Sequence, residues 1–177
     1  MSRAAWPPAS VRDLLSSDGR VQRVAADGDY ARRIVETVCE EELVLALFAA
    51  AREQWSKANT LTYDAARKAV EAALLAAGWR IRAVAGAHAF VGDVVDRWLG
   101  PGADPGPRIA ARFSASRKAR HDDEYPHPEG RRRSTAELRA LAQDNVRLVN
   151  FALEKLEVDP RPDLVPTDAN IDRFRRQ

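Results

Sequence analysis

The sequence predicts an all-α fold, an up-and-down bundle of about five to six helices. Apolar residues recur at helical spacing through most of the 177-residue chain. No stretch shows the alternation of apolar and polar side chains that marks a half-buried strand. Glycine and proline are concentrated at a few points, and they divide the chain into separate helical segments.

The N-terminal half of the chain holds four predicted segments, at residues 11–24, 29–54, 62–78 and 88–99. The first is a short amphipathic turn or two. Asp29 can cap the second segment, and Thr62 or Asp64 can begin the third. Alanine is so frequent in the third segment that we expect a close approach between helices. Gly78 weakens or ends that helix.

The C-terminal half begins with a loop at residues 100–107, which are rich in glycine and proline. The helix predicted at residues 108–124 ends there because a residue before proline disfavours the α conformation, and Pro126 and Pro128 follow. Ser134 and Glu137 match the capping box of a long final helix.

The chain is therefore expected to have three parts. Residues 1–27 form an N-terminal arm with a short helix, and residues 28–157 form one helical domain. Residues 158–177 form a proline-rich tail, which is expected to lie extended with one turn at residues 171–174.

Composition predicts a soluble cytoplasmic protein. Hydrophobic residues make up 45% of the chain and charged residues 31%, as in ordinary globular proteins. No apolar run is long enough for a membrane span, and the N-terminus lacks a signal-peptide pattern. The one cysteine, Cys39, lies in an apolar helical pattern and is expected to be a buried, inert thiol.

Several functional classes find no support. The chain has no glycine-rich phosphate loop, no His-Glu-x-x-His pattern and no pair of cysteines. Its three histidines are not spaced as metal ligands on one helix, so we expect neither a metal nor a cofactor. His88 is expected to lie at a helix start, and Asn145 to be a hydrogen-bonded polar residue in the core. Trp55 and Tyr63 are expected to be packing aromatics on either side of a loop.

Residues 117–128 hold the densest set of groups that transfer protons or bind phosphate. They include three Lys or Arg, two histidines, three acids and a tyrosine. The triplet at residues 131–133 follows, just before the N-terminus of the next helix, where positive charge opposes the helix dipole. A solubilising loop or a phosphate-binding site would each account for that triplet.

The candidate residues fall into two sets. The expected RNA-binding cations are Arg117, Lys118, Arg131, Arg132 and Arg133. The expected catalytic groups are Arg120, His121, Tyr125 and His127. Guanidinium and imidazole groups together can bind a phosphate and move a proton without a metal.

Three stretches resemble the HEPN superfamily (higher eukaryotes and prokaryotes nucleotide-binding domain). They are Tyr63-Asp-Ala-Ala-Arg-Lys-Ala69, Gly86-Ala-His88 and Arg120-His-Asp-Asp-Glu-Tyr-Pro-His127. The resemblance covers roughly residues 28–157. It implies a helical bundle, usually a homodimer, and in many members a metal-independent endoribonuclease. Such members are toxins of toxin–antitoxin or phage-defence pairs, so RNA and a cognate antitoxin are the implied partners.

The nuclease motif of this family is an arginine followed, after four to six residues, by a histidine. Arg120 and His127 match it with six residues between them. At the commonest, four-residue spacing this chain has Tyr125 instead. The alternative is therefore a non-catalytic adaptor that binds a nucleotide or a nucleotidyltransferase-like partner, with Tyr125 as its modification site.

Overall fold

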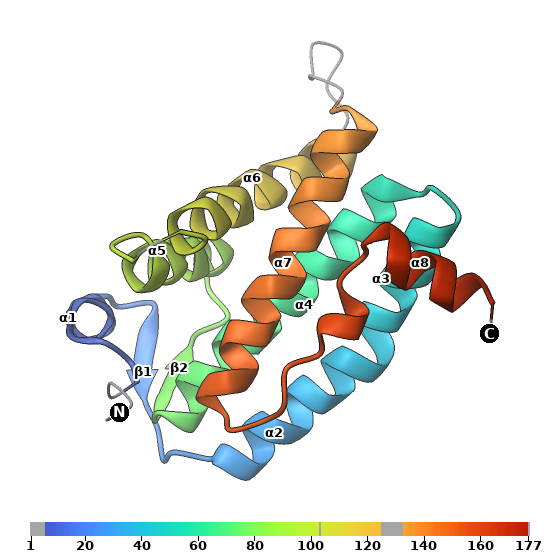
Figure 1. Cartoon of the computed structure of the whole chain (residues 1–177). Helices are drawn as coiled ribbons and strands as arrows, with labels where there is room; N and C mark the ends of the chain where they lie inside the picture. Colours follow the sequence, from blue (N-terminus) through green and yellow to red (C-terminus); the bar gives the residue numbers. More distant parts are fainter. Residues whose placement is uncertain (1–5, 103, 125–132, 177) are drawn as a thin grey trace.

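The computed structural model describes residues 6–102, 104–124 and 133–176 (Figure 1). Helices dominate this part of the chain, so the predicted all-α class is confirmed. In chain order the elements are α1 (Ala9–Ser17), β1 (Val21–Arg23), α2 (Gly28–Thr37), a π-helical segment (Val38–Leu43), α3 (Val44–Ala51), α4 (Trp55–Ala76), β2 (Trp79–Ile81), α5 (Ala87–Leu99), α6 (Gly106–Glu124), α7 (Thr135–Lys155), a 3₁₀ turn (Pro162–Leu164) and α8 (Asp168–Arg175).

Helix α4 lies at the centre of the fold. It packs against α7, against α2 and α3, and against α5 and α6. Its alanines at positions 58, 65, 66, 69, 72 and 73 are all buried. Tyr63, also on α4, stacks on Phe113 of α6 with 5.0 Å between ring centroids. The close helix approach predicted from the alanine content is confirmed.

Helices α4 and α7 run in the same direction (Figure 1). Near their starts the Arg139 guanidinium lies 5.4 Å from the centroid of a Trp55 ring. Further along, Asn145 donates to the Thr62 hydroxyl at 3.3 Å. The up-and-down order expected from the sequence is therefore wrong for this pair. The connection through α5 and α6 is long enough to bring the chain back to the end of the bundle where α4 starts, and α7 begins there.

Helix α4 starts earlier than predicted, at Trp55 rather than at Thr62 or Asp64. Trp55 and Ala58 are buried in a small cluster with Leu47 and Ile171. Burial against residues distant in sequence extends the helix through a polar stretch that has little apolar periodicity. Trp55 and Tyr63 thus lie on one helix and not on either side of a loop.

Two short strands correct the expectation that the chain has none. β1 and β2 pair antiparallel, with Val21 opposite Ile81 and Arg23 opposite Trp79. Each strand has three residues, too few to show an alternating pattern in the sequence. Gly78, whose φ of +81° suits glycine, turns the chain from α4 into β2.

The ends of the other helices follow local chemistry. Asp27, and not Asp29, caps α2, since its carboxylate accepts from the Tyr30 N–H at 2.9 Å. The capping box of Ser134 and Glu137 at the start of α7 is confirmed. The tail is not wholly extended, because α8 forms there and buries Ile171.

Three further expectations concern single features. Cys39 is buried, as predicted, and burial raises the pKa of its thiol to about 11, which disfavours the reactive thiolate. Asn145 is buried and also donates to Ser116 at 3.1 Å. Of the helices in the described residues, none combines the length and apolar character that crossing a bilayer requires.

The central position of α4 can be tested by enlarging one of its alanines. Ala69 is fully buried, so Ala69→Leu should lower the free energy of unfolding by about 1–3 kcal/mol through overpacking. Ala111→Leu, on the exposed face of α6, is the matched control, because leucine and alanine have similar helix propensities. Urea unfolding followed by circular dichroism measures both. Equal stability of the two variants would contradict the packing described for α4.

Candidate nucleic-acid interface

The predicted site residues lie at the C-terminal end of α6 and in the segment between α6 and α7. Arg117, Lys118 and His121 are exposed on the last turns of α6. Four of the predicted residues lie outside the described part of the chain: Tyr125, His127, Arg131 and Arg132. The expected meeting of Arg120 and His127 therefore remains a prediction.

Arg120 points inward, toward α4. Its Nη1 lies 3.3 Å from Oδ1 of Asp64, and both side chains are 23% exposed. Its guanidinium carbon lies 5.9 Å from the centroid of the Tyr63 ring. The C-terminal turns of α6 thus present Arg117 and Lys118 to solvent while Arg120 ties α6 to α4.

Asp64 and Arg120 belong to a larger set of charges, which we call the α4–α6 network. Arg67 lies 3.8 Å from Asp64, and its Nη1 donates to Glu71 at 2.8 Å. The three α4 residues are spaced by three and four positions, so they share one face of the helix. Asp64, Arg67, Glu71 and Arg120 together carry two negative and two positive charges. The network is electrically balanced.

His88 adjoins the α4–α6 network. Its pKa is lowered chiefly by partial burial, and then by the positive charges of Arg67 and Arg120; Glu71 and Asp64 act in the opposite sense. The neutral imidazole is therefore favoured. His88 is the second residue of α5, as the sequence predicts, but its charged neighbours come from α4 and α6. No local sequence signal brings these segments together.

Tyr63 lies beneath Arg120 and is fully buried. Burial raises the pKa of its phenol to about 12, so the hydroxyl stays protonated at any physiological pH. Within the described residues, that hydroxyl has no hydrogen-bond partner. Tyr63 therefore serves as a packing group for α6 and does not supply a reactive phenolate.

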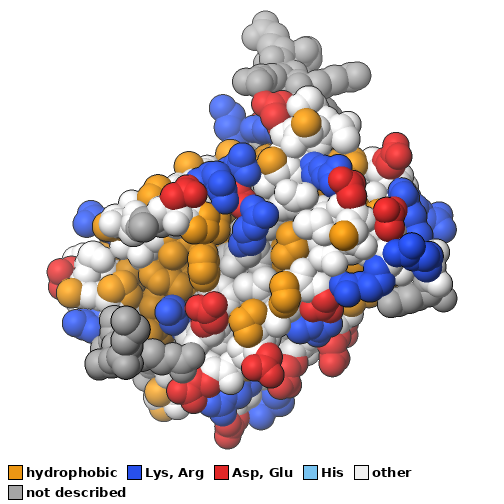
Figure 2. All heavy atoms as spheres, in the orientation of Figure 1, with side chains coloured by type: hydrophobic (Ala, Val, Ile, Leu, Met, Phe, Trp, Pro, Cys, Tyr) orange, Lys and Arg blue, Asp and Glu red, His pale blue; other side chains and the backbone are white. Residues whose placement is uncertain are grey.

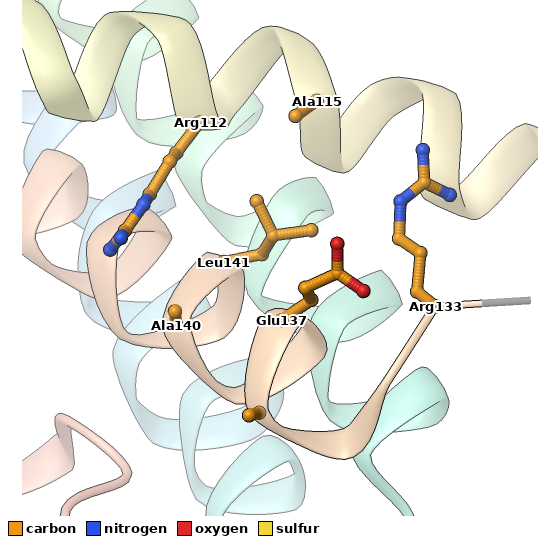
Figure 3. A pocket seen from close by; sticks show the side chains of 7 residues that line it. Arg112, Ala115, Arg133, Glu137, Ala140 and Leu141 are labelled. Atoms are coloured by element: carbon orange, nitrogen blue, oxygen red, sulfur yellow. The ribbon is translucent and has the colours of Figure 1, made fainter.

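A groove of about 370 Å³ runs between α6 and α7 (Figure 3). Its floor and walls are mainly alanine and leucine side chains. Arg112 and Arg133 stand on opposite sides of it, with Glu137 and Leu141 between them. The volume is in the range of ligand pockets, about 300–1,000 Å³, which combine apolar walls with a few polar groups.

Two interactions hold the Arg133 end of this groove in place. Arg133 Nη1 donates to Oδ2 of Asp122 at 3.1 Å, which joins the start of α7 to the end of α6. Glu137 accepts from the Ser134 N–H at 2.9 Å as part of the capping box. A guanidinium has five N–H donors, so Arg133 can hold Asp122 and still donate to a ligand.

Basic side chains gather over α6 and the space between α6 and α7 (Figure 2). Arg112 and Arg133 line the groove, and Arg108 and Arg147 lie with Arg112 around Asp144, while Arg117 and Lys118 are exposed further along α6. Groups of this kind neutralise phosphates. No cluster of metal-ligating side chains occurs in the described residues. The arrangement therefore suits binding of a phosphate-bearing ligand by guanidinium groups.

Comparisons of the chain with protein-family models, with curated proteins and with solved structures gave no match. The resemblance to the HEPN superfamily therefore stays a prediction from the sequence motifs alone.

The α4–α6 network predicts opposite pKa changes at His88. Removing the positive charge in Arg120→Gln should raise the pKa of His88, and removing the negative charge in Asp64→Asn should lower it. Titration of the imidazole protons by NMR, assigned with His88→Gln, measures both. Arg33→Gln, on the exposed face of α2, should leave the titration unchanged. If both network variants behave like Arg33→Gln, His88 is not coupled to these charges.

Proposed function

We propose that this chain is a cytoplasmic, metal-independent endoribonuclease, the toxin of a toxin–antitoxin or phage-defence pair. One observation supports the RNA-binding part: Arg112 and Arg133 line the groove between α6 and α7, and Arg133 donates to Asp122, which lies within the Arg120–His127 motif in sequence. The catalytic part rests on that motif and on its resemblance to HEPN nucleases.

In this proposal the 2′-hydroxyl of RNA attacks the adjacent phosphate. The bond from phosphorus to the 5′-oxygen of the next nucleotide breaks, and a 2′,3′-cyclic phosphate remains on the other product. The 2′-hydroxyl gives up its proton and the leaving 5′-oxygen takes one up, and His127 transfers one of these protons, assisted by His121 or Tyr125. Arg120 stabilises the negative charge that develops on the phosphate. The exposed Arg117 and Lys118 bind the RNA backbone nearby.

Arg120 can act in this way only if it exchanges its ion pair with Asp64 for the substrate. Each side chain of the pair is only 23% exposed, so breaking it costs more than the roughly 0–1 kcal/mol of a surface pair, and the bound phosphate must replace Asp64 as the partner of the guanidinium. The active nuclease is proposed to be a homodimer whose two α6 ends face one another.

The nuclease proposal can be tested with purified protein, total RNA or tRNA, and EDTA in the buffer. The wild type should cut RNA, whereas His127→Ala and Arg120→Ala should lose about 10²–10⁴-fold in rate, the usual contribution of a general acid or base. Arg33→Ala, purified in parallel, controls for contaminating nuclease. No cleavage, or cleavage equal in all four proteins, rejects the catalytic claim.

The inward ion pair of Arg120 also favours a second function, a non-catalytic adaptor that binds a nucleotide or a nucleotidyltransferase-like partner. In such a protein Arg120 joins α6 to α4, and Tyr125 is the site of modification. A mass increase on Tyr125 after co-expression with the product of the neighbouring gene, combined with absence of RNA cleavage, would select this function over the nuclease.

The proposed homodimer can be tested separately by its mass in solution. Light scattering at micromolar concentration should yield twice the 19.6 kDa mass of the chain. A mass of one chain across the concentration range would contradict the proposed homodimer.

A further inference from the structure

Asp144 of α7 has a fully buried side chain, and three guanidinium groups gather on it. Nη1 of Arg112 donates to Oδ2 at 2.6 Å. Arg147 donates to Oδ1. Nε of Arg108 lies 3.5 Å from Oδ2. The carboxylate thus joins two arginines of α6 to one of α7 at the end of the groove that Arg112 lines.

This set has more positive charge than Asp144 needs. A buried carboxylate must be paired, but one or two well-placed guanidiniums are enough to compensate it. Here three positive charges face one buried negative charge. Of the other acids, Asp104 lies 4.0 Å from Arg108 and is 76% exposed, so its attraction is weak, and Glu137 lies further along the groove that Arg112 lines. Even with Asp104 counted, one positive charge remains.

The three arginines remain open to solvent on their outer side. Arg108, Arg112 and Arg147 are 43%, 37% and 38% exposed, whereas Asp144 is 0% exposed. Each guanidinium has five N–H donors and no acceptor. Most of these donors therefore remain for an anion on the solvent side, while the buried carboxylate holds the three groups together against their mutual repulsion.

The chemistry of the outer surface favours phosphate. Guanidinium groups bind phosphate oxygens with two parallel hydrogen bonds, and a phosphate offers several oxygens to several arginines at once. The α4–α6 network around Arg120 is different, because its acids and bases balance. Of these two clusters, only the one on Asp144 has uncompensated charge.

We propose that Arg108, Arg112 and Arg147 form a phosphate-binding cradle built on Asp144. The cradle holds a backbone phosphate of RNA, and the strand continues along the α6–α7 groove toward Arg133. The identity of the ligand as RNA rests on the proposed function. The phosphate site itself rests on the arrangement of these four side chains.

The experiment uses a fluorescein-labelled 2′-O-methyl RNA oligonucleotide, which lacks the attacking hydroxyl and cannot be cut by it. Fluorescence anisotropy measures its affinity for the wild type and for Arg108→Gln, Arg112→Gln and Arg147→Gln. Each of these variants should bind about tenfold more weakly, because a charge-assisted hydrogen bond to phosphate is lost. Each variant should also make the slope of log K against log salt concentration shallower by about 0.7, because one phosphate contact is lost.

Arg33→Gln is the matched control, since it removes the same charge from an exposed site on α2. It should bind within about twofold of the wild type. Thermal melting shows whether each variant is folded. If Arg112→Gln unfolds, Arg108→Gln still tests the cradle. Arg108 makes the longest of the three ion pairs with Asp144, so its replacement should disturb the fold least.

Three outcomes are distinguishable. If folded Arg108→Gln, Arg112→Gln and Arg147→Gln bind like Arg33→Gln, the cradle is overturned even if RNA is cleaved. AMP, titrated into the same variants by calorimetry, is the second probe. If AMP binds in an arginine-dependent manner and the oligonucleotide does not, the cradle stands, but its ligand is a free nucleotide and the RNA assignment fails. If the oligonucleotide depends on the three arginines but intact RNA is never cut, the cradle stands and the nuclease proposal fails.

Discussion

The close packing of α4 against its neighbours is the constraint on which the rest of the structure depends. Small alanine side chains bring α7, α6 and the α2–α3 helix within reach of one central helix. That proximity places Thr62, Ser116 and Asn145 in one buried hydrogen-bonded group at the junction of α4, α6 and α7. The same junction sets where the arginines of α6 are directed, toward α4 on one face and toward α7 on another.

Two acids divide Arg108, Arg112 and Arg120 of α6 into two classes with different chemistry. Asp64 on α4 binds Arg120 within a network whose charges balance, so this arginine contributes to holding the helices together. Asp144 on α7 is buried beneath three arginines and leaves positive charge at the surface. The placement of the partner acids thus decides which arginines keep uncompensated charge at the surface.

Part of the candidate site could be predicted from the sequence. The basic cluster at the end of α6, the capping box of α7 and the buried Cys39 follow from local composition and spacing. The cradle on Asp144 was not predicted, because Arg108, Arg112 and Arg147 are unremarkable as isolated helical residues. The approach of His88 to Arg67 and Arg120 was missed for the same reason. A carboxylate at position 144 within the apolar stripe of α7 was the one signal that could have pointed to a buried charge.

The sequence by itself determined the helical class, most helix ends and the concentration of cations around residues 112–133. These depend on periodicity, capping and proline, which act within a few residues along the chain. Only the tertiary structure decided the early start of α4, the β1–β2 pair, the common direction of α4 and α7, and the partner of each arginine. Burial and ion pairing between segments tens of residues apart set these features, and no local pattern records which distant segments will meet.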